Sequence, residues 1–435
     1  MKKSLSQSCT LSALAAVAWL ACQALPAQNT PNPQAQVRQL QELVRQQGER
    51  LAAMEALLAK QQQSVASLAK AQQATPAAQS GSTEVVVPKV SLRKGIDQLK
   101  IVGDLRLRYE HQNRDVGGVE SSRDRFMPRL RLGLVWTASD WEMGAGLATG
   151  GSGATSTNDT WNSTNPFQTD DIRLDYAYAK RQWCDFTLTL GQQKNPFVST
   201  WAIWDGDVRP TGVTGQYNHG PWFATLGGYN VRHYGRDEDN AYLGAGQVGA
   251  KGTRGNLSGK AALSLYHYNN ATVDPNDTTN QPAPAIATDD YTFSMGSLYA
   301  EASYKGEGWK STLYGEYTRN FAADGTISQV AGMPAGSGPD DNDTAWVLGA
   351  KVGISDFGIG YAYAHIEADS VYGRVNDGTI GAAFTSTDIE GHVIVLSYAP
   401  TKRLKLSAQA FLVEPIERSD RGDGELFLVD ATWKF

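Results

Sequence analysis

Residues 99–110 read LKIVGDLRLRYE, in which apolar side chains alternate with mostly charged ones. Successive side chains of a β-strand point to opposite faces, so a period of two predicts a strand with one apolar and one charged face. The alternation returns along the chain, and we count about sixteen such segments, within the range of outer-membrane barrels. The other clear segments are 125–136, 172–180, 186–192, 222–231, 257–268, 291–304, 309–319, 345–352, 357–365, 389–398, 404–413 and 426–435, and the weaker ones are 141–149, 211–219 and 241–252.

The connections between these segments alternate between short and long. Short turns occur at 138–140, 220–221, 253–255 and 400–401, whereas long polar loops occupy 150–169, 269–290, 322–343 and 368–387. This alternation is typical of barrels with tight periplasmic turns and long extracellular loops. Lipid offers no partner to an open sheet edge, so the sheet must close. We therefore predict an all-β transmembrane barrel of about sixteen antiparallel strands over residues 97–435, with both termini in the periplasm.

Composition excludes two other classes of protein. The chain has 435 residues, a formal net charge of -6 and a mean hydropathy of -0.38. That hydropathy is too polar for a bundle of membrane helices, each of which needs about 20 apolar residues. No basic stretch is dense enough to follow a phosphate backbone, so we expect no nucleic-acid partner.

The first 27 residues predict export from the cytoplasm. Lys2 and Lys3 precede an apolar stretch at 11–20 and a small-residue cleavage site at 25–27, the pattern of a secretory signal peptide. A lipid anchor at Cys22 is the alternative. Cleavage after residue 27 leaves Cys184 as the only cysteine, so we expect no internal disulfide.

A heptad pattern over residues 28–75 predicts a periplasmic α-helical coiled coil. Apolar residues recur every seven positions with companions three residues later, which is an a/d seam. Two glutamines in the same seam form polar layers that trimers tolerate. A solitary amphipathic helix and a disordered linker are the alternatives, and a Pro/Gly/Ser-containing linker follows at 76–96. The seam residues are Val37, Leu40, Val44, Gln47, Leu51, Met54, Leu58, Gln61, Val65 and Leu68.

The last strand ends on an aromatic residue. Phe427, Val429, Ala431, Trp433 and Phe435 share one face of the segment 426–435. This end resembles the assembly signal of bacterial outer-membrane barrels. The resemblance implies the barrel assembly machinery, outer-membrane lipid and lipopolysaccharide as partners.

Four runs of residues together resemble a known family. They are 103–110, 125–133, 174–178 and 191–212, the last containing Asn195-Pro196-Phe197 and Trp204-Asp205-Gly206-Asp207. The chain resembles the putative porin family of Gram-negative outer membranes and, more broadly, the trimeric sixteen-stranded porins. This resemblance implies a homotrimer in the outer membrane.

Strand parity predicts which charges face the lumen. If the leucines at 105, 107, 130 and 132 face lipid, the arginines between them face inward, because neighbours on a strand point to opposite sides. An arginine facing lipid near the midplane costs about 2–4 kcal/mol, which supports this assignment. The alternative is that these arginines form structural salt bridges with Asp104, Glu110 and Asp175. The predicted lumenal arginines are Arg106, Arg108, Arg129, Arg131 and Arg173.

The resemblance also implies a role for residues 195–211, the third long loop. In sixteen-stranded porins this loop folds into the barrel and narrows it, which would place Trp201, Trp204, Asp205 and Asp207 opposite the arginines. The alternative is a surface loop whose tryptophans pack on the rim. Opposed rows of charge at a constriction would orient polar solutes and water.

These features favour a passive diffusion channel for small hydrophilic solutes or ions. One alternative is a structural tether that links the outer membrane to peptidoglycan through the coiled coil. A less favoured alternative is a barrel hydrolase, because no histidine has a partner at catalytic or metal-ligand spacing. We therefore expect no enzymatic activity, no metal and no cofactor.

Overall fold

The computed structural model describes residues 45, 96–151, 153–169, 171–233, 240–269, 293–323, 328–330, 333, 338–380, 386–418 and 421–435. The chain divides into two compact units, Met1–Lys89 and Val90–Phe435. The predicted signal peptide and, apart from helical Arg45 and Ile96, the predicted coiled coil and linker lie outside the described residues. Those predictions therefore stay predictions.

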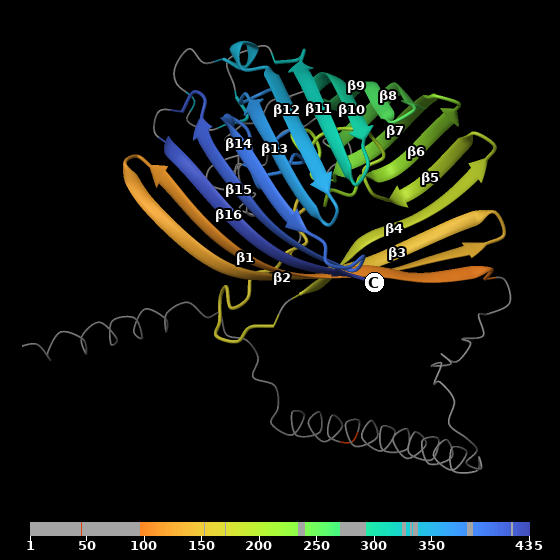
Figure 1. Cartoon of the computed structure of the whole chain (residues 1–435), viewed down its shortest axis with the longest axis horizontal. Coiled ribbons are helices and arrows are strands. Elements are labelled where there is room, and N and C mark those ends of the chain that lie inside the picture. Colours follow the sequence, from red (N-terminus) through yellow and green to blue (C-terminus); the bar gives the residue numbers. More distant parts are fainter. Residues whose placement is uncertain are drawn as a thin grey trace, which may run out of the picture. The chain divides into compact units, whose positions relative to one another are not determined.

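The second unit is a closed barrel of sixteen antiparallel strands, as the sequence predicts (Figure 1). Each strand pairs with its neighbours along the chain, and β1 pairs with β16 to close the sheet. In the described part of the chain, no helix is long and apolar enough to cross a membrane. The strands are β1 Gln98–Val116, β2 Val119–Ala138, β3 Trp141–Thr149, β4 Ile172–Trp183, β5 Phe186–Gln192, β6 Thr211–His219, β7 Trp222–Arg232, β8 Ala241–Arg254, β9 Leu257–Asn269, β10 Phe293–Lys305, β11 Trp309–Asn320, β12 Thr344–Ile354, β13 Phe357–Ile366, β14 Ile389–Tyr398, β15 Leu404–Pro415 and β16 Arg421–Lys434, with a short 3-10 helix η2 at Pro339–Asp341.

The first hairpin is longer than the sequence predicts. β1 and β2 continue to a two-residue turn, where Gly117 and Gly118 have φ values of 63° and 77°. This left-handed conformation suits glycine, which has no Cβ to clash with the backbone. The turn lies at the same end of the barrel as the long loops, because the other end carries the two chain ends of the sheet.

Alternation along β1 and β2 gives the barrel its two faces. Leu105 and Leu107 are each 38% exposed, whereas Asp104 between Gly103 and Leu105 is 8% exposed. Outward leucines therefore alternate with inward charged residues, in agreement with the parity argument. Aromatic side chains such as Trp222 and Phe357 lie outward beside tight turns, where girdles are expected.

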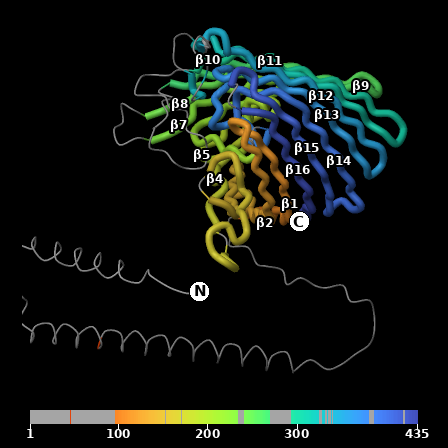
Figure 2. Tube along the Cα trace, turned by 90° about the vertical axis from the view of Figure 1, so that its left-hand side faces the viewer, coloured from red at the N-terminus to blue at the C-terminus, as the bar shows by residue number. Residues whose placement is uncertain are grey.

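Barrel closure brings the last residue beside the first strand. The backbone groups of Gly103 and Phe435 exchange two hydrogen bonds of 3.1 Å. Figure 2 shows β1 and β2 beside β16 at the chain's end. A Cβ on Gly103 would lie 2.2 Å from the Arg131 carbonyl oxygen and 2.6 Å from the Phe435 ring. Glycine at this position therefore allows the terminal ring to lie against the seam.

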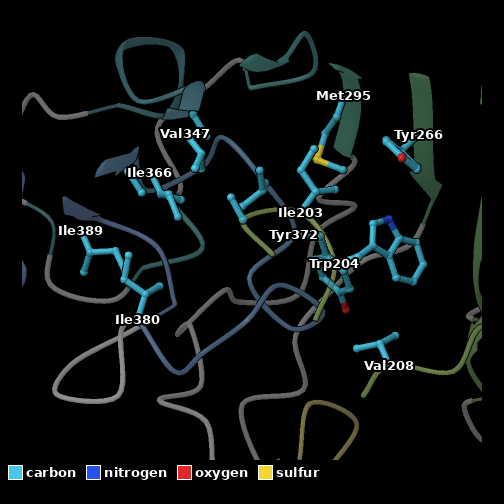
Figure 3. Close-up of a cluster of buried hydrophobic side chains, with 14 of the residues drawn as sticks. Ile203, Trp204, Val208, Tyr266, Met295, Val347, Ile366, Tyr372, Ile380 and Ile389 are labelled. Atoms are coloured by element: carbon cyan, nitrogen blue, oxygen red, sulfur yellow. The ribbon is translucent and has the colours of Figure 1, made fainter. Parts of the chain in front are cut away.

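The interior of the barrel contains a hydrophobic core made by two loops. We name the segment 193–210, between β5 and β6, L3, and the segment 367–388, between β13 and β14, L7. Their buried apolar side chains pack on inward-facing residues of the wall, among them Leu243, Met295 and Val347. Figure 3 shows this cluster, with Trp204 and Ile203 from L3 and Tyr372 from L7. The inward face of this side of the barrel is therefore apolar because loops cover it.

Candidate functional site

L3 is anchored to the inward faces of β8 and β11. The Val198 amide donates to Gln247 Oε1 at 2.9 Å, and Gln247 Nε2 donates back to the Val198 carbonyl at 2.8 Å. The Thr200 amide donates to the carboxylate of Glu316, which is buried on β11. Two wall side chains therefore satisfy buried backbone groups of L3 that would otherwise have no partner.

Aromatic packing holds the middle of L3 against β9. Trp204 is 5% exposed, and its ring centroid lies 6.3 Å from those of Phe197 and Tyr266. Phe197 also meets Tyr266 edge to face, with centroids 5.4 Å apart. Trp201 is less buried, and both it and Tyr314 of β11 pack against this buried cluster. Both tryptophans singled out in the sequence thus lie against the inner wall.

L3 also contacts L7. The Asp205 amide donates to the Val375 carbonyl at 2.8 Å, and the Asp377 amide donates to the Trp201 carbonyl at 2.9 Å. A side-chain hydrogen bond joins the carboxyl groups of Asp205 and Asp377. Burial and the neighbouring charge of Asp377 raise the pKa of Asp205 to about 9. Asp205 is therefore protonated at neutral pH and shares its proton with Asp377.

Asp207 contacts the opposite wall. Its carboxylate lies 3.1 Å from Arg131 Nη1 on β2 and accepts a hydrogen bond of 2.8 Å from the Thr157 hydroxyl. Burial opposes ionisation, but Arg129 and Arg131 prevail and lower the pKa of Asp207. Asp207 is therefore ionised, in contrast to Asp205 two residues earlier.

The arginines on β1 and β2 differ in their partners. Arg129 and Arg131 both contact Asp104, at 2.7 Å each, across the β1–β2 pair. Arg108 forms two hydrogen bonds, of 2.7 and 2.9 Å, with Asp430 on β16. These three arginines are salt-bridged. Arg129 and Arg131 pair with an aspartate that the alternative interpretation named, whereas Arg108 pairs with Asp430, which it did not name.

The other two predicted arginines form no salt bridge with a carboxylate among the described residues. Arg106 donates to the side-chain oxygen of Asn158 in the loop between β3 and β4. Arg173 donates to the carbonyl oxygens of Gly151, Gly153 and Ser156 in that same loop. In the described structure neither arginine forms a close ion pair, although the charge of Asp207 acts on both at longer range.

Two cationic residues near this wall were not predicted from the sequence as site residues. Arg209 at the end of L3 lies 3.2 Å from Asp175, and both side chains are buried. Lys194 at the start of L3 has an exposed side chain, and its pKa is lowered by partial desolvation of its ammonium and by the charges of Arg209 and Arg131. Their positions at the two ends of L3 could have indicated them. No feature of the sequence predicts the contact between Asp205 and Asp377, because it joins loops that are far apart in the chain.

Glycines on β2 and β3 make room for tyrosine rings on the inner wall. A Cβ on Gly146 would lie 2.3 Å from the Tyr176 ring, and one on Gly144 would lie 2.4 Å from the Tyr178 ring. Tyr178 in turn donates to Glu142 at 3.0 Å. Within the described ranges, no group of three or more metal-ligating side chains is present.

One family profile matches part of the chain. Residues 116–300 match the sequence profile of the family described as putative porin. They run from the end of β1 to the middle of β10 and include L3. No curated protein sequence matches the chain significantly.

Solved structures with a similar fold include three outer-membrane proteins or porins. A triple mutant of the Rhodopseudomonas blastica porin is 11% identical with a TM-score of 0.43, covering 78% of this chain and 100% of its own. Salmonella typhi OmpF in complex with daunomycin is 9% identical with a TM-score of 0.46, and the match covers 78% of this chain and 97% of the OmpF chain. OmpT of Vibrio cholerae, an outer membrane protein in trimer form, is 12% identical with a TM-score of 0.43, covering 78% and 99%. At these identities the likeness concerns the fold alone.

Proposed function

We propose that the chain is an outer-membrane diffusion channel for small hydrophilic solutes or ions. The observation that carries this proposal is a closed sixteen-stranded barrel whose inward side holds L3 between two walls. Barrels of sixteen strands enclose an aqueous channel, whereas those of eight are filled by side chains. The putative porin profile and the barrel fold favour a channel over an enzyme.

L3 and L7 supply the restriction in this proposal. They fill the side of the lumen next to β7–β14 with apolar side chains, and solutes pass between L3 and the charged wall of β1, β2 and β4. The wall residues are Arg106, Arg108, Arg129, Arg131 and Arg173, and Asp207 of L3 faces them. Trp201, Trp204 and Asp205 instead hold L3 in position, because their contacts are with β9, β11 and L7.

The finer parts of the proposal follow from symmetry and topology. An even strand number places both ends of the sheet on one side, which is the periplasm in this class of barrel. A homotrimer lets every chain use the same surfaces, and a three-stranded coiled coil would match that symmetry. No comparison supports the tether or the hydrolase.

Solute uptake by liposomes tests the channel directly. Liposomes that contain the folded full chain should swell in isotonic solutions of small neutral sugars, at rates that fall as the sugar becomes larger. Protein-free liposomes are the control. Comparison of the gel mobility of unheated and heated protein shows whether the barrel is folded. If the barrel is folded and the liposomes swell no faster than the control, the proposal is contradicted.

A further inference from the structure

Cationic side chains outnumber carboxylates on the wall that faces L3. Around Asp207, the described residues of β1, β2, β4, β16 and L3 provide seven cationic groups and four carboxylates, not counting Asp205, which faces L7. Glu110, farther along β1, has its own partners in Arg123 and Arg125. The carboxylates belong to Asp104, Asp175, Asp207 and Asp430. The cationic groups belong to Arg106, Arg108, Arg129, Arg131, Arg173, Lys194 and Arg209.

Each of the four carboxylates is already engaged. Asp104 lies between Arg129 and Arg131, and Asp430 is held by Arg108. Asp175 meets Arg209, and Asp207 meets Arg131 and Thr157. A carboxylate in a close pair presents little net charge to a passing ion, so the wall offers cations few binding groups.

Asp205 does not restore the balance. It is 7% exposed and turned toward L7, where it shares a proton with Asp377. Asp205 is neutral at neutral pH and lies on the side of L3 that packs against L7. The expectation that Asp205 stands opposite the arginines is therefore wrong, because burial against L7 removes it from that wall.

Two of the cations remain available to a solute. Lys194 is exposed, and its ammonium makes no hydrogen bond or ion pair to any residue that the structure describes. Arg106 donates to an amide oxygen, while its buried Nε has no hydrogen-bond partner among the described residues. An ammonium supplies a point charge and a guanidinium supplies a planar set of donors, and both suit the oxygens of carboxylates and phosphates.

We propose that this channel selects small oxyanions, and that Lys194 and Arg106 are the groups that attract them. This inference rests on the proposed function. Arg129 lies opposite Arg106 in the β1–β2 pair, and the charges of Arg131 and Asp104 act on Lys194. These residues therefore link the two cations, and the charges of the two linking arginines are balanced by Asp104 and Asp207. An anion that passes L3 would exchange one cationic group for the next, and none binds it so tightly that it cannot leave.

Reversal potentials of the full chain in planar lipid bilayers test the inference. In a potassium chloride gradient with about 0.1 M salt on the dilute side, at pH 7, the reversal potential should show that the unmodified channel prefers chloride to potassium. Lys194→Gln should lower the anion-to-cation permeability ratio about twofold, and Arg106→Gln should act in the same direction. Lys402→Gln is the matched control, because it removes the same charge from a tight turn on the opposite end of the barrel and should leave the ratio unchanged.

Replacing chloride on one side by acetate or by inorganic phosphate distinguishes the two oxyanion chemistries. Higher permeability of acetate would assign carboxylates, and higher permeability of phosphate would assign phosphates. Preference for potassium, or an equal effect of Lys194→Gln and Lys402→Gln, would overturn the inference while leaving a channel in place. Absence of any conductance would instead overturn the proposed function. Because Lys194 is exposed, its variant folds even if Arg106→Gln does not.

Discussion

Asp205 in L3 and Asp377 in L7 share a hydrogen bond between their carboxyl groups, flanked by two backbone hydrogen bonds of 2.8 and 2.9 Å between the same loops. Two adjacent carboxylates cannot both ionise without strong repulsion, so the contact requires a proton. The charge of Asp207 also raises the pKa of Asp205, whereas the hydrogen bond from the Asp207 amide to Asp205 Oδ1 lowers it. Attachment of L3 to L7 is therefore linked to pH.

We predict that the attachment weakens as the pH rises. The pKa of Asp205 is about 3.9 in an unfolded chain and about 9 in the folded one, so docking takes up a proton between these values. Stability is greatest below pH 4 and declines as the pH rises toward 9, by at most about 1.4 kcal/mol for each pH unit. Protease cleavage within L3, measured from pH 5 to pH 9, should accelerate with pH.

Asp205→Asn provides the control for this prediction. An asparagine keeps a neutral hydrogen-bonding side chain of the same shape, so cleavage of the variant should depend less on pH than cleavage of the unmodified chain. If both proteins show the same dependence on pH, the carboxyl pair is not the group that responds.

Asp205 and Asp207 should differ in their effect on ion preference. Asp207 is ionised against Arg131, so Asp207→Asn releases positive charge and should move the reversal potential toward anions. Asp205→Asn should have little effect at pH 7, because Asp205 is neutral before the change and asparagine is neutral after it. The Asp207 shift should shrink in 1 M salt, where screening acts over about 3 Å. Equal shifts from both variants would contradict the different protonation of the two residues.

Gly103→Ala should destabilise the closed barrel. The added methyl group would clash with the Arg131 carbonyl and the Phe435 ring at the seam between β1 and β16. The temperature at which the folded barrel loses its fast mobility in a denaturing gel should fall. Gly252→Ala is the matched control on β8, because a Cβ there meets no atom within 4 Å. If this temperature falls equally in both variants, the destabilisation comes from replacing a strand glycine by alanine in general and not from a clash at the seam.

The predicted coiled coil should stabilise a trimer. Leu51→Asp with Leu58→Asp places charges in its seam and should lower the temperature at which the oligomer dissociates, because buried charges without partners are costly. Gln47→Asp with Gln61→Asp, at seam positions that are already polar, should have a smaller effect. Native mass spectrometry of the unmodified chain should show three copies, and monomers would contradict the trimer.

The sequence predicts the barrel better than its interior. Alternation in residues 99–110 predicts both the strand and the inward position of Arg106 and Arg108, because side-chain direction in a strand depends on parity alone. The number of strands follows from the same rule. L7 and its contact with L3 are different, since no local period relates Asp205 to Asp377.

Pairing of charges across the barrel could not be predicted either. Arg108 and Asp430 lie on β1 and β16, which are adjacent only because the sheet closes. Apolar residues on the inward side, such as Leu243 and Val347, break the expected polar lining. Their positions become intelligible once L3 and L7 cover them, and that depends on how loops fold into the lumen.

Single-channel conductance of the full chain, compared with that of Trp204→Ala, tests the central claim that L3 restricts a channel within this barrel. Removing the buried indole leaves a cavity beside Phe197 and Tyr266 and costs about 3–5 kcal/mol, which loosens L3 from the wall. Trp161→Ala is the control, because Trp161 is 44% exposed in the loop between β3 and β4. We predict discrete conductance steps for all three proteins, with larger or noisier steps for Trp204→Ala alone. Folded barrels that give no steps, or steps that Trp204→Ala leaves unchanged, would contradict the account.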